Sequence, residues 1–190
     1  MPADLRPAAF IDRDGVINVE RHHVHHIEDF EVLPGVLQGL NELATAGYAL
    51  VVVTNQSGIA KGLYGADAYT RLTEHMRAWF DQRGVRFAGI YHCPHHPQGR
   101  VAAYAGDCAC RKPAPGMLLK AAAELGLDLS LSVMVGDKPS DTASGRAAGL
   151  RWTVLVESGH ALPADTAGLA DHRCAGLAQA AAWLCRQRLD

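Results

Sequence analysis

Short apolar runs alternate along the chain with longer amphipathic stretches. The runs predict strands over 8–11, 48–53, 87–91, 132–137 and 152–156. The second of these is almost entirely β-branched or apolar, which is typical of a strand buried on both faces of a parallel sheet. Helical spacing of Val36, Leu37, Leu40 and Leu43 predicts a helix that Pro34–Gly35 opens and Gly47 ends. Further helices are expected over 67–82, 115–125, 140–149, with Ser140 as N-cap, and 177–189.

Regular alternation of strands and helices indicates an α/β fold, a doubly wound (Rossmann-like) parallel sheet with helices on both faces. Such sheets bind ligands beyond the carboxyl ends of their strands, at the switch in strand order. Asp12, Thr54 and Asp137 each stand at the end of a predicted strand. The fold hypothesis therefore brings three reactive side chains to one edge.

Two carboxylates follow the first predicted strand, and Gly15 then allows a sharp turn. Asp12 and Asp14 are two positions apart, so both side chains can point the same way. Two converging acids repel each other unless a cation or a shared proton relieves them. Magnesium, a hard cation that prefers oxygen ligands, would do this. The working hypothesis is a nucleophile at Asp12 and a proton donor at Asp14, against the plainer interpretation of an acidic Asp-Gly turn.

Composition places limits on the function class. With 190 residues, 48% hydrophobic, 20% charged and a net charge of −2, the chain suits a single domain over 1–190. No basic surplus points to nucleic acid, no apolar run is long enough to cross a bilayer, and the first residues lack the apolar region of a signal peptide. We expect a cytoplasmic protein, and the modest charge permits a monomer.

Cysteines and histidines cluster between residues 92 and 112. Cys93, Cys108 and Cys110 together with one nearby histidine would close a tetrahedral zinc shell, leaving no open position for catalysis. Zinc would then be structural and would pin the 92–112 loop, which ends in Arg111 and Lys112. The spacing leaves three candidates for the fourth ligand, namely His92, His95 and His96. The histidines at 22, 23, 25 and 26 have no partner cysteine and indicate a solvated loop, while Cys174 and Cys185 read as ordinary buried or partly buried cysteines.

Four short motifs occur in order along the chain. They are Asp12-Arg13-Asp14-Gly15, Thr54-Asn55, Lys112, and Gly136-Asp137 with Lys138 and Asp141. In this order the chain resembles the haloacid dehalogenase superfamily of phosphatases. Residues 12–18, 54–60, 93–97 and 108–113 extend the resemblance to the D-glycero-D-manno-heptose 1,7-bisphosphate 7-phosphatases, over nearly the whole chain.

The resemblance implies roles for individual residues. Asp12 would attack phosphorus and form an aspartyl-phosphate, and Asp14 would protonate the leaving sugar oxygen and then activate water. Thr54 and Lys112 look like the phosphoryl clamp. Asp12, Asp137 and the backbone carbonyl of Asp14 resemble the magnesium ligands, and His95 is favoured as the fourth zinc ligand. Substrate contacts implied by the resemblance fall on Arg13, Glu20, Arg21, His23, Asn55, Gln56, Ser57, Arg111 and Lys138.

By the same resemblance the substrate is a small sugar bisphosphate, and the product feeds ADP- or GDP-heptose for lipopolysaccharide or a related glycan. Arg111 is the natural contact for the second phosphate because its guanidinium matches oxyanions. Relatives often show Gly-Tyr-Val where this chain has His22-His23-Val24, which leaves the anomer preference open. About forty residues separate Asp14 from Thr54, too few for a cap domain.

Three alternatives stay open at this point. Histidinol-phosphate phosphatases share the four motifs and a similar zinc loop, but act on a monophosphate. A signalling receiver domain also carries a phosphorylated Asp and a Lys on a doubly wound sheet, although its phosphoacceptor ends a middle strand and no zinc loop is expected. A zinc-stabilised binding module would need no catalytic Asp12 at all.

Overall fold

The computed structural model describes residues 5–160 and 168–187, and in this part of the chain all sheet pairings are parallel. The sheet has six strands in the order β3-β2-β1-β4-β5-β6. Their bounds are β1 Ala8–Ile11, β2 Ala49–Asn55, β3 Gly89–Cys93, β4 Val133–Gly136, β5 Trp152–Val156 and β6 His172–Cys174. The α/β prediction is confirmed.

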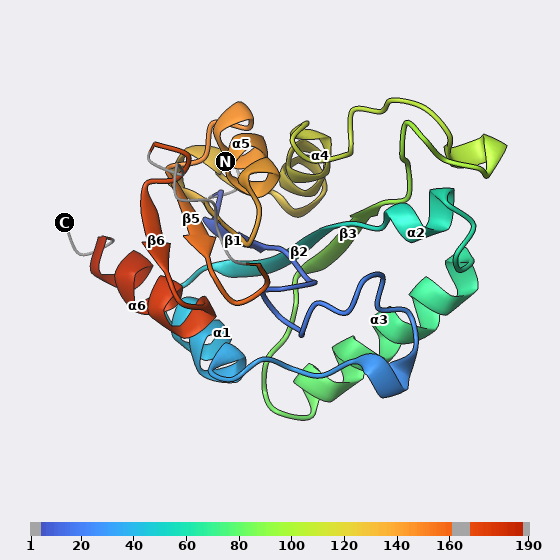
Figure 1. Cartoon of the computed structure of the whole chain (residues 1–190). Coiled ribbons are helices and arrows are strands. Elements are labelled where there is room, and N and C mark those ends of the chain that lie inside the picture. The colour runs from blue at the N-terminus through green and yellow to red at the C-terminus, as the bar shows by residue number, and fades with distance from the viewer. Residues whose placement is uncertain (1–4, 161–167, 188–190) are drawn as a thin grey trace.

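Helices cover both faces of this sheet (Figure 1). On one face lie α1 (Val36–Thr45), α3 (Ala66–Asp81) and α6 (Leu177–Gln187), and on the other lie α4 (Gly116–Leu125) and α5 (Pro139–Ala147). One turn of helix, α2 (Ser57–Ala60), follows β2, and short 3-10 turns span Ile27–Asp29, Ala102–Tyr104 and Leu129–Leu131. Because helices cover both faces of the sheet, a site can form only beyond the ends of its strands.

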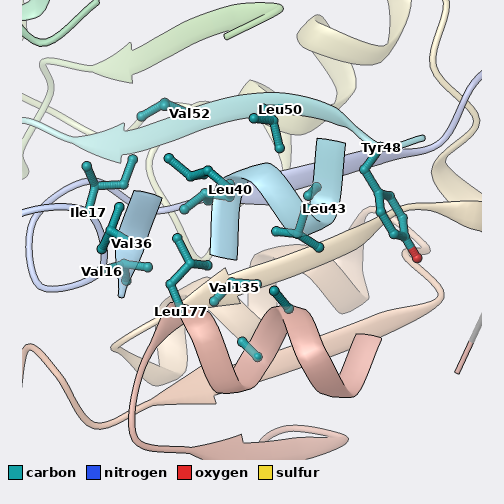
Figure 2. Close-up of a cluster of buried hydrophobic side chains, with 14 of the residues drawn as sticks. Val16, Ile17, Val36, Leu40, Leu43, Tyr48, Leu50, Val52, Val135 and Leu177 are labelled. Atoms are coloured by element: carbon teal, nitrogen blue, oxygen red, sulfur yellow. The ribbon is translucent and has the colours of Figure 1, made fainter. Parts of the chain in front are cut away.

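The alternation of side chains along each strand divides the core in two. Ile11, Val52 and Val135 face the cluster that includes Leu40 and Leu43 of α1. Figure 2 shows α1 lying between β2 and α6, with these leucines among the buried apolar side chains. Phe10, Val51, Val53 and Met134 face the other way, towards Met117, Leu118 and Ala121 of α4. β1 is wholly buried because both faces are covered.

Strand order reverses on either side of β1, which pairs with β2 on one edge and β4 on the other. At such a point the connections that follow the two neighbouring strands run to opposite faces of the sheet. A crevice therefore lies between them, beyond the carboxyl ends of these strands. Between residues 14 and 54 the structure contains loop, one 3-10 turn and α1. No cap domain is inserted there, as expected.

Several element boundaries differ from the sequence prediction. β2 runs two residues further, so Thr54 and Asn55 belong to the strand and pair with His92 and Cys93. β3 begins and ends two residues later than predicted, because its pairing with β2 extends to Cys93. Ser140 as N-cap is wrong. Helix α5 begins at Pro139, and the Asp141 carboxylate accepts a hydrogen bond from the backbone N–H of Lys138, the N-cap residue, at 2.9 Å.

The last predicted helix is present as α6 to Gln187, and its remaining predicted residues lie outside the described part. The sequence prediction missed the edge strand β6 altogether. None of the described helices has the length and apolarity needed to cross a lipid bilayer.

Candidate active site

Three strand ends meet at the switch point, and each supplies one of the predicted side chains. Asp12 follows β1, and its backbone N–H donates to the Val135 carbonyl of β4 at 3.0 Å. Asp137 follows β4 directly, and Thr54 lies near the end of β2. The carboxylates of Asp12, Asp137 and Asp141 place oxygens within 4.8 Å of one another. The predicted convergence of residues distant in the chain is therefore observed.

Lysine 112 supplies the only cation in direct contact with two of these acids among the described residues. Its Nζ lies 2.9 Å from Asp12 Oδ1 and 2.7 Å from Asp141 Oδ1, and donates to the Val53 carbonyl at 2.8 Å. The lysine is 3% exposed, so the pairs form away from bulk water. Burial alone would lower the pKa of Lys112, but Asp12 and Asp141 outweigh it and raise that pKa.

Negative charge still exceeds positive charge in this cluster. Burial raises the pKa of Asp12 to about 8; Lys112 opposes that shift, while Asp141 and Asp137 add to it. Burial also raises the pKa of Asp137, which is 0% exposed. Buried carboxylates in such a group need a cation or a proton.

Asp137 is the acid best prepared to bind a metal. Its Oδ1 is buried and has no hydrogen-bond partner among the described residues. Asp141, by contrast, has both oxygens engaged, one by Lys112 and one by the Lys138 N–H. An unsatisfied buried carboxylate oxygen beside Asp12 fits a hard divalent cation. Asp12 and Asp137 are therefore the carboxylates that could hold a divalent cation, while Asp141 holds Lys112.

Asp14 does not turn its side chain into this acidic cluster. Its carboxylate accepts hydrogen bonds from Arg13 at 2.8 and 2.9 Å, from Asn18 at 3.1 Å and from Gln56 at 3.0 Å. Burial favours a higher pKa for Asp14, but Arg13 and these donors outweigh it, and the pKa is lowered. The carboxylate form is thus favoured before substrate arrives. An incoming phosphoryl dianion would raise this pKa, since like charges disfavour ionisation.

The three strand ends open into a cavity of about 470 Å³. Predicted site residues along its wall are Asp12, Asp14, Glu20, His23, Thr54, Asn55, Gln56, Ser57, Arg111, Lys112 and Lys138. His22, Pro113, Ser140, Asp141 and His160 also line it. The volume is in the usual range for a small-molecule site, and the many charged and polar side chains on the wall suit a charged, hydroxylated ligand better than an apolar one.

Two predicted substrate contacts do not line this cavity. Arg13 is 1% exposed, and its guanidinium holds Asp14 rather than facing the opening. Arg21 is exposed and forms an ion pair with Glu31. Asn55 lines the wall, yet its side-chain amide also exchanges two hydrogen bonds of 3.1 Å with the backbone of Lys112, which fixes that lysine across the sheet edge.

The loop over 92–112 gathers the predicted zinc ligands. Sulfurs of Cys93, Cys108 and Cys110 lie 3.0 to 3.4 Å apart, and His95 Nδ1 lies 3.5 Å from Cys110 and 3.8 Å from Cys93. A tetrahedral shell with Zn–S bonds of about 2.3 Å has edges of about 3.8 Å, so the sulfurs lie somewhat closer together than in such a shell. Three thiols and one imidazole converging on one point are nevertheless a donor set that suits zinc.

The competition among the three histidines is resolved in favour of His95. His92 instead packs its ring on Tyr69, with ring centroids 4.0 Å apart. The ring of His96 accepts a hydrogen bond from the Gln98 N–H. The cluster is consistent with a structural zinc, and Arg111 beside it donates to the His95 carbonyl at 3.3 Å.

Sequence reasoning gave no role to His160, Tyr64 or Asp141. His160 Nδ1 lies 2.6 Å from Asp137 Oδ2, and no motif signalled this contact from a loop far along the chain. The Tyr64 hydroxyl reaches Gln56 from the segment after α2. Asp141 belongs to the fourth motif, but with Ser140 expected as the N-cap its contacts with Lys112 and with the Lys138 N–H could not be anticipated.

Comparison with known proteins bears on this geometry. Residues 109–180 match the HAD-hydrolase-like family model. The D-glycero-beta-D-manno-heptose-1,7-bisphosphate 7-phosphatase of Yersinia pestis is 47% identical over 165 residues, covering 87% of this chain and 88% of that protein. The enzyme of the same name from Escherichia coli K12 is also 47% identical over 165 residues, covering 87% and 86%.

The chain belongs to the D-glycero-beta-D-manno-heptose-1,7-bisphosphate 7-phosphatase family. A solved member from B. bronchiseptica, D,D-heptose 1,7-bisphosphate phosphatase in complex with magnesium and phosphate, superposes with a TM-score of 0.79 at 30% identity. The superposition covers 95% of this chain and 99% of that one. Magnesium in that relative is consistent with a cation site at the acidic group of this chain, and membership in this family of phosphatases excludes the receiver domain and the non-catalytic module.

Magnesium should stabilise the protein, and the effect should depend on pH. Because the pKa of Asp12 is raised to about 8 in the fold, the metal-free fold loses stability as pH rises from about 4 to about 8. Magnesium at a hundred times its Kd adds about 2.7 kcal/mol, or about 5 to 10 °C in melting temperature. Melting curves at pH 8 with EDTA and with magnesium measure this increment.

Asp137→Asn is the matched control for that measurement. It keeps the shape of the side chain but removes the charge that lies unsatisfied beside Asp12. The variant should show little magnesium-dependent increase in melting temperature. An increment equal to that of the wild type would contradict the metal assignment.

Proposed function

We propose that the chain removes the 7-phosphate of D-glycero-D-manno-heptose 1,7-bisphosphate, through a phosphorylated Asp12. The observation that carries this proposal is that Asp12, Thr54 and Lys112 line one cavity, with the buried Asp137 carboxylate within 4.8 Å of that of Asp12. A cavity of about 470 Å³ has room for a sugar bisphosphate. The names of the relatives point to the β anomer and to the 7-position.

In the first step an Asp12 carboxylate oxygen attacks phosphorus, and the bond between phosphorus and the C7 oxygen breaks. The electron pair leaves with that oxygen, which takes a proton from Asp14. In the second step Asp14 accepts a proton from water as the water oxygen attacks the same phosphorus, and the bond to Asp12 breaks to release phosphate. Covalent catalysis thereby divides one difficult displacement into two easier ones.

Asp12, Asp137 and the backbone carbonyl of Asp14 would hold magnesium, which neutralises phosphoryl charge when bound. Lys112 places a second cation at the nucleophile, and the Thr54 hydroxyl donates to a phosphoryl oxygen. Since phosphoryl transfer depends mainly on positioning and charge stabilisation, fixed donors are the main contribution of these residues.

Substrate selection falls to the loops around the cavity. Arg111 binds the distal phosphate, and Glu20, His23 and Lys138 contact sugar hydroxyls or that phosphate. Lys138 Nζ lies 3.5 Å from Glu20 and 3.8 Å from Asp137, so it ties the 19–26 loop to the end of β4. Zinc at the Cys93 cluster would hold the loop that carries Arg111 and Lys112.

The proposal includes a cytoplasmic monomer organised as one domain over 1–190. A reducing compartment suits the thiols at 93, 108 and 110, which serve as zinc ligands only when they are not oxidised to disulfides. The product would feed nucleotide-activated heptose for lipopolysaccharide.

A phosphate-release assay tests the substrate. We expect the heptose 1,7-bisphosphate to be hydrolysed with a higher kcat/KM than heptose 7-phosphate or histidinol phosphate. Arg111→Ala should lower kcat/KM for the bisphosphate by about 10- to 100-fold, since a hydrogen bond to a charged group contributes about 1.5–3 kcal/mol. The monophosphate serves as internal control, because it lacks the distal phosphate. Preference for histidinol phosphate would overturn the substrate assignment.

A further inference from the structure

A buried chain of hydrogen bonds reaches the active site from the segment after α2. The Tyr64 hydroxyl donates to Gln56 Oε1 at 2.6 Å. The amide nitrogen of Gln56 then donates to Thr54 Oγ1 at 2.8 Å and to Asp14 Oδ2 at 3.0 Å. Tyr64 is 8% exposed and Gln56 is 2% exposed, so water competes little for these contacts. One amide thus touches both the phosphoryl clamp and the proton donor.

The direction of the Gln56 amide decides what it can do. An amide carries two N–H donors on one side and an acceptor oxygen on the other. Here the oxygen receives the Tyr64 hydroxyl and, at 3.4 Å, Arg13. In the reversed orientation the Gln56 amide oxygen would face the Asp14 carboxylate, and its nitrogen would face the Tyr64 hydroxyl and the Arg13 guanidinium. The first contact would set two acceptors against each other, and the second would leave the Arg13 donor without an acceptor. Tyr64 therefore favours the one orientation that supports the catalytic residues.

This orientation has consequences for both groups. With a lone pair of Thr54 Oγ1 occupied by the amide N–H, the threonine hydroxyl proton is free to donate into the cavity. Asp14 gains a third donor besides Arg13 and Asn18, which fixes the direction of its carboxylate. Proton transfer requires the donor to lie within hydrogen-bond reach of the leaving oxygen, so this direction matters to the rate.

Local packing holds Tyr64 in place. A Cβ on Gly58 would lie 2.1 Å from Tyr64 Cε1, so the ring fits only because residue 58 is glycine. Ile59 and Tyr69 surround it, and the His25 ring stacks on it with centroids 4.7 Å apart and planes at 8°. Burial raises the pKa of the Tyr64 phenol, which stays protonated and acts as a donor.

We propose that Tyr64 is a positioning residue for phosphoryl transfer, whose hydroxyl fixes the Gln56 amide and through it the Thr54 hydroxyl and the Asp14 carboxylate. The inference rests on the phosphatase function proposed above and adds a residue that touches neither substrate nor metal. Tyr64 is not part of the cavity wall around Asp12.

A double-mutant cycle tests this coupling. Tyr64→Phe keeps the ring and removes the hydroxyl, and should lower kcat by about tenfold with KM within about twofold, as expected for one lost hydrogen bond. In a Gln56→Leu background the same change should have almost no further effect, because Tyr64 acts through the amide. Tyr91→Phe is the matched control, since its hydroxyl donates to Glu124 at the surface.

The cycle is run with the heptose bisphosphate and with p-nitrophenyl phosphate. Failure to hydrolyse the bisphosphate would overturn the proposed substrate but leave the cycle readable on the second ester. Should Gln56→Leu be too slow to measure, the side-chain amide resonances of Gln56 in Tyr64→Phe decide, and they are expected to shift. An unchanged kcat in Tyr64→Phe, equal losses in both backgrounds, or unshifted resonances would each overturn the proposal.

Discussion

Asp12→Asn should abolish phosphate release, with kcat falling by at least about 10⁴-fold, while the metal-free protein becomes no less stable. An amide cannot form the covalent intermediate, and loss of a nucleophile commonly costs about 10⁴–10⁶ in kcat. The fold should tolerate the change because the Asp12 carboxylate is unfavourable where it lies: burial, with repulsion from Asp141 and Asp137, raises its pKa to about 8. Lys112 keeps its partner Asp141.

Phosphate release and melting temperature in EDTA are the two measurements, made at pH 8, where much of the Asp12 charge is present. An equal or higher melting temperature together with lost activity would mark a residue kept for chemistry at the expense of stability. Substantial turnover by the variant would exclude Asp12 as the nucleophile. A fall in melting temperature of several degrees would contradict the electrostatic argument.

Cys108→Ser should lose the zinc and with it at least about 3 kcal/mol of stability, which is about 6 to 12 °C in melting temperature. The loop over 92–112 has little regular structure besides the end of β3 and one 3-10 turn, so few other contacts replace the metal. Activity should fall as well, because Arg111 and Lys112 follow Cys110 directly. Metal content of the freshly purified protein and its melting curve check this expectation.

Cys174→Ser is the matched control for the zinc site. Cys174 is half-buried on β6, far along the sheet from the cluster, and its thiol donates weakly to the Gly176 carbonyl. This variant should retain one zinc per chain and full activity. Zinc retained at full occupancy in Cys108→Ser, or absent from the wild type, would refute the assignment of the cluster.

Most of the fold could be predicted because its strands are apolar and buried on both faces, and hydrophobic pattern alone identifies such strands. β6 could not be predicted in this way. His172, Arg173 and Cys174 form a short edge strand, half-buried or exposed, whose identity comes from pairing with β5. Thr54 and Asn55 likewise belong to β2 because they pair with β3, and the local sequence pattern does not predict that pairing.

The site shows a similar division. Residue types and spacing indicated the acids and the three cysteines, while the family resemblance pointed to Lys112 and to His95. They could not show that Asp14 turns towards Arg13, or that Arg21 pairs with Glu31 away from the cavity. Side-chain direction depends on contacts between distant segments, as with Tyr64 and Gln56. Such contacts become visible only once the chain is folded.

Strand ends, the first turns of α2 and α5, and loops border the cavity, and no cap domain lies between residues 14 and 54 to cover it. Enzymes that close a lid or a second domain over the reactants must reopen it in every cycle, and that motion often limits the rate. In the proposed mechanism solvent can reach the phosphorylated Asp12 without such an opening, so hydrolysis of that intermediate can follow as soon as the sugar departs. Selection between sugars must then occur when the substrate first binds, through the short loops around the cavity, without a later closing step.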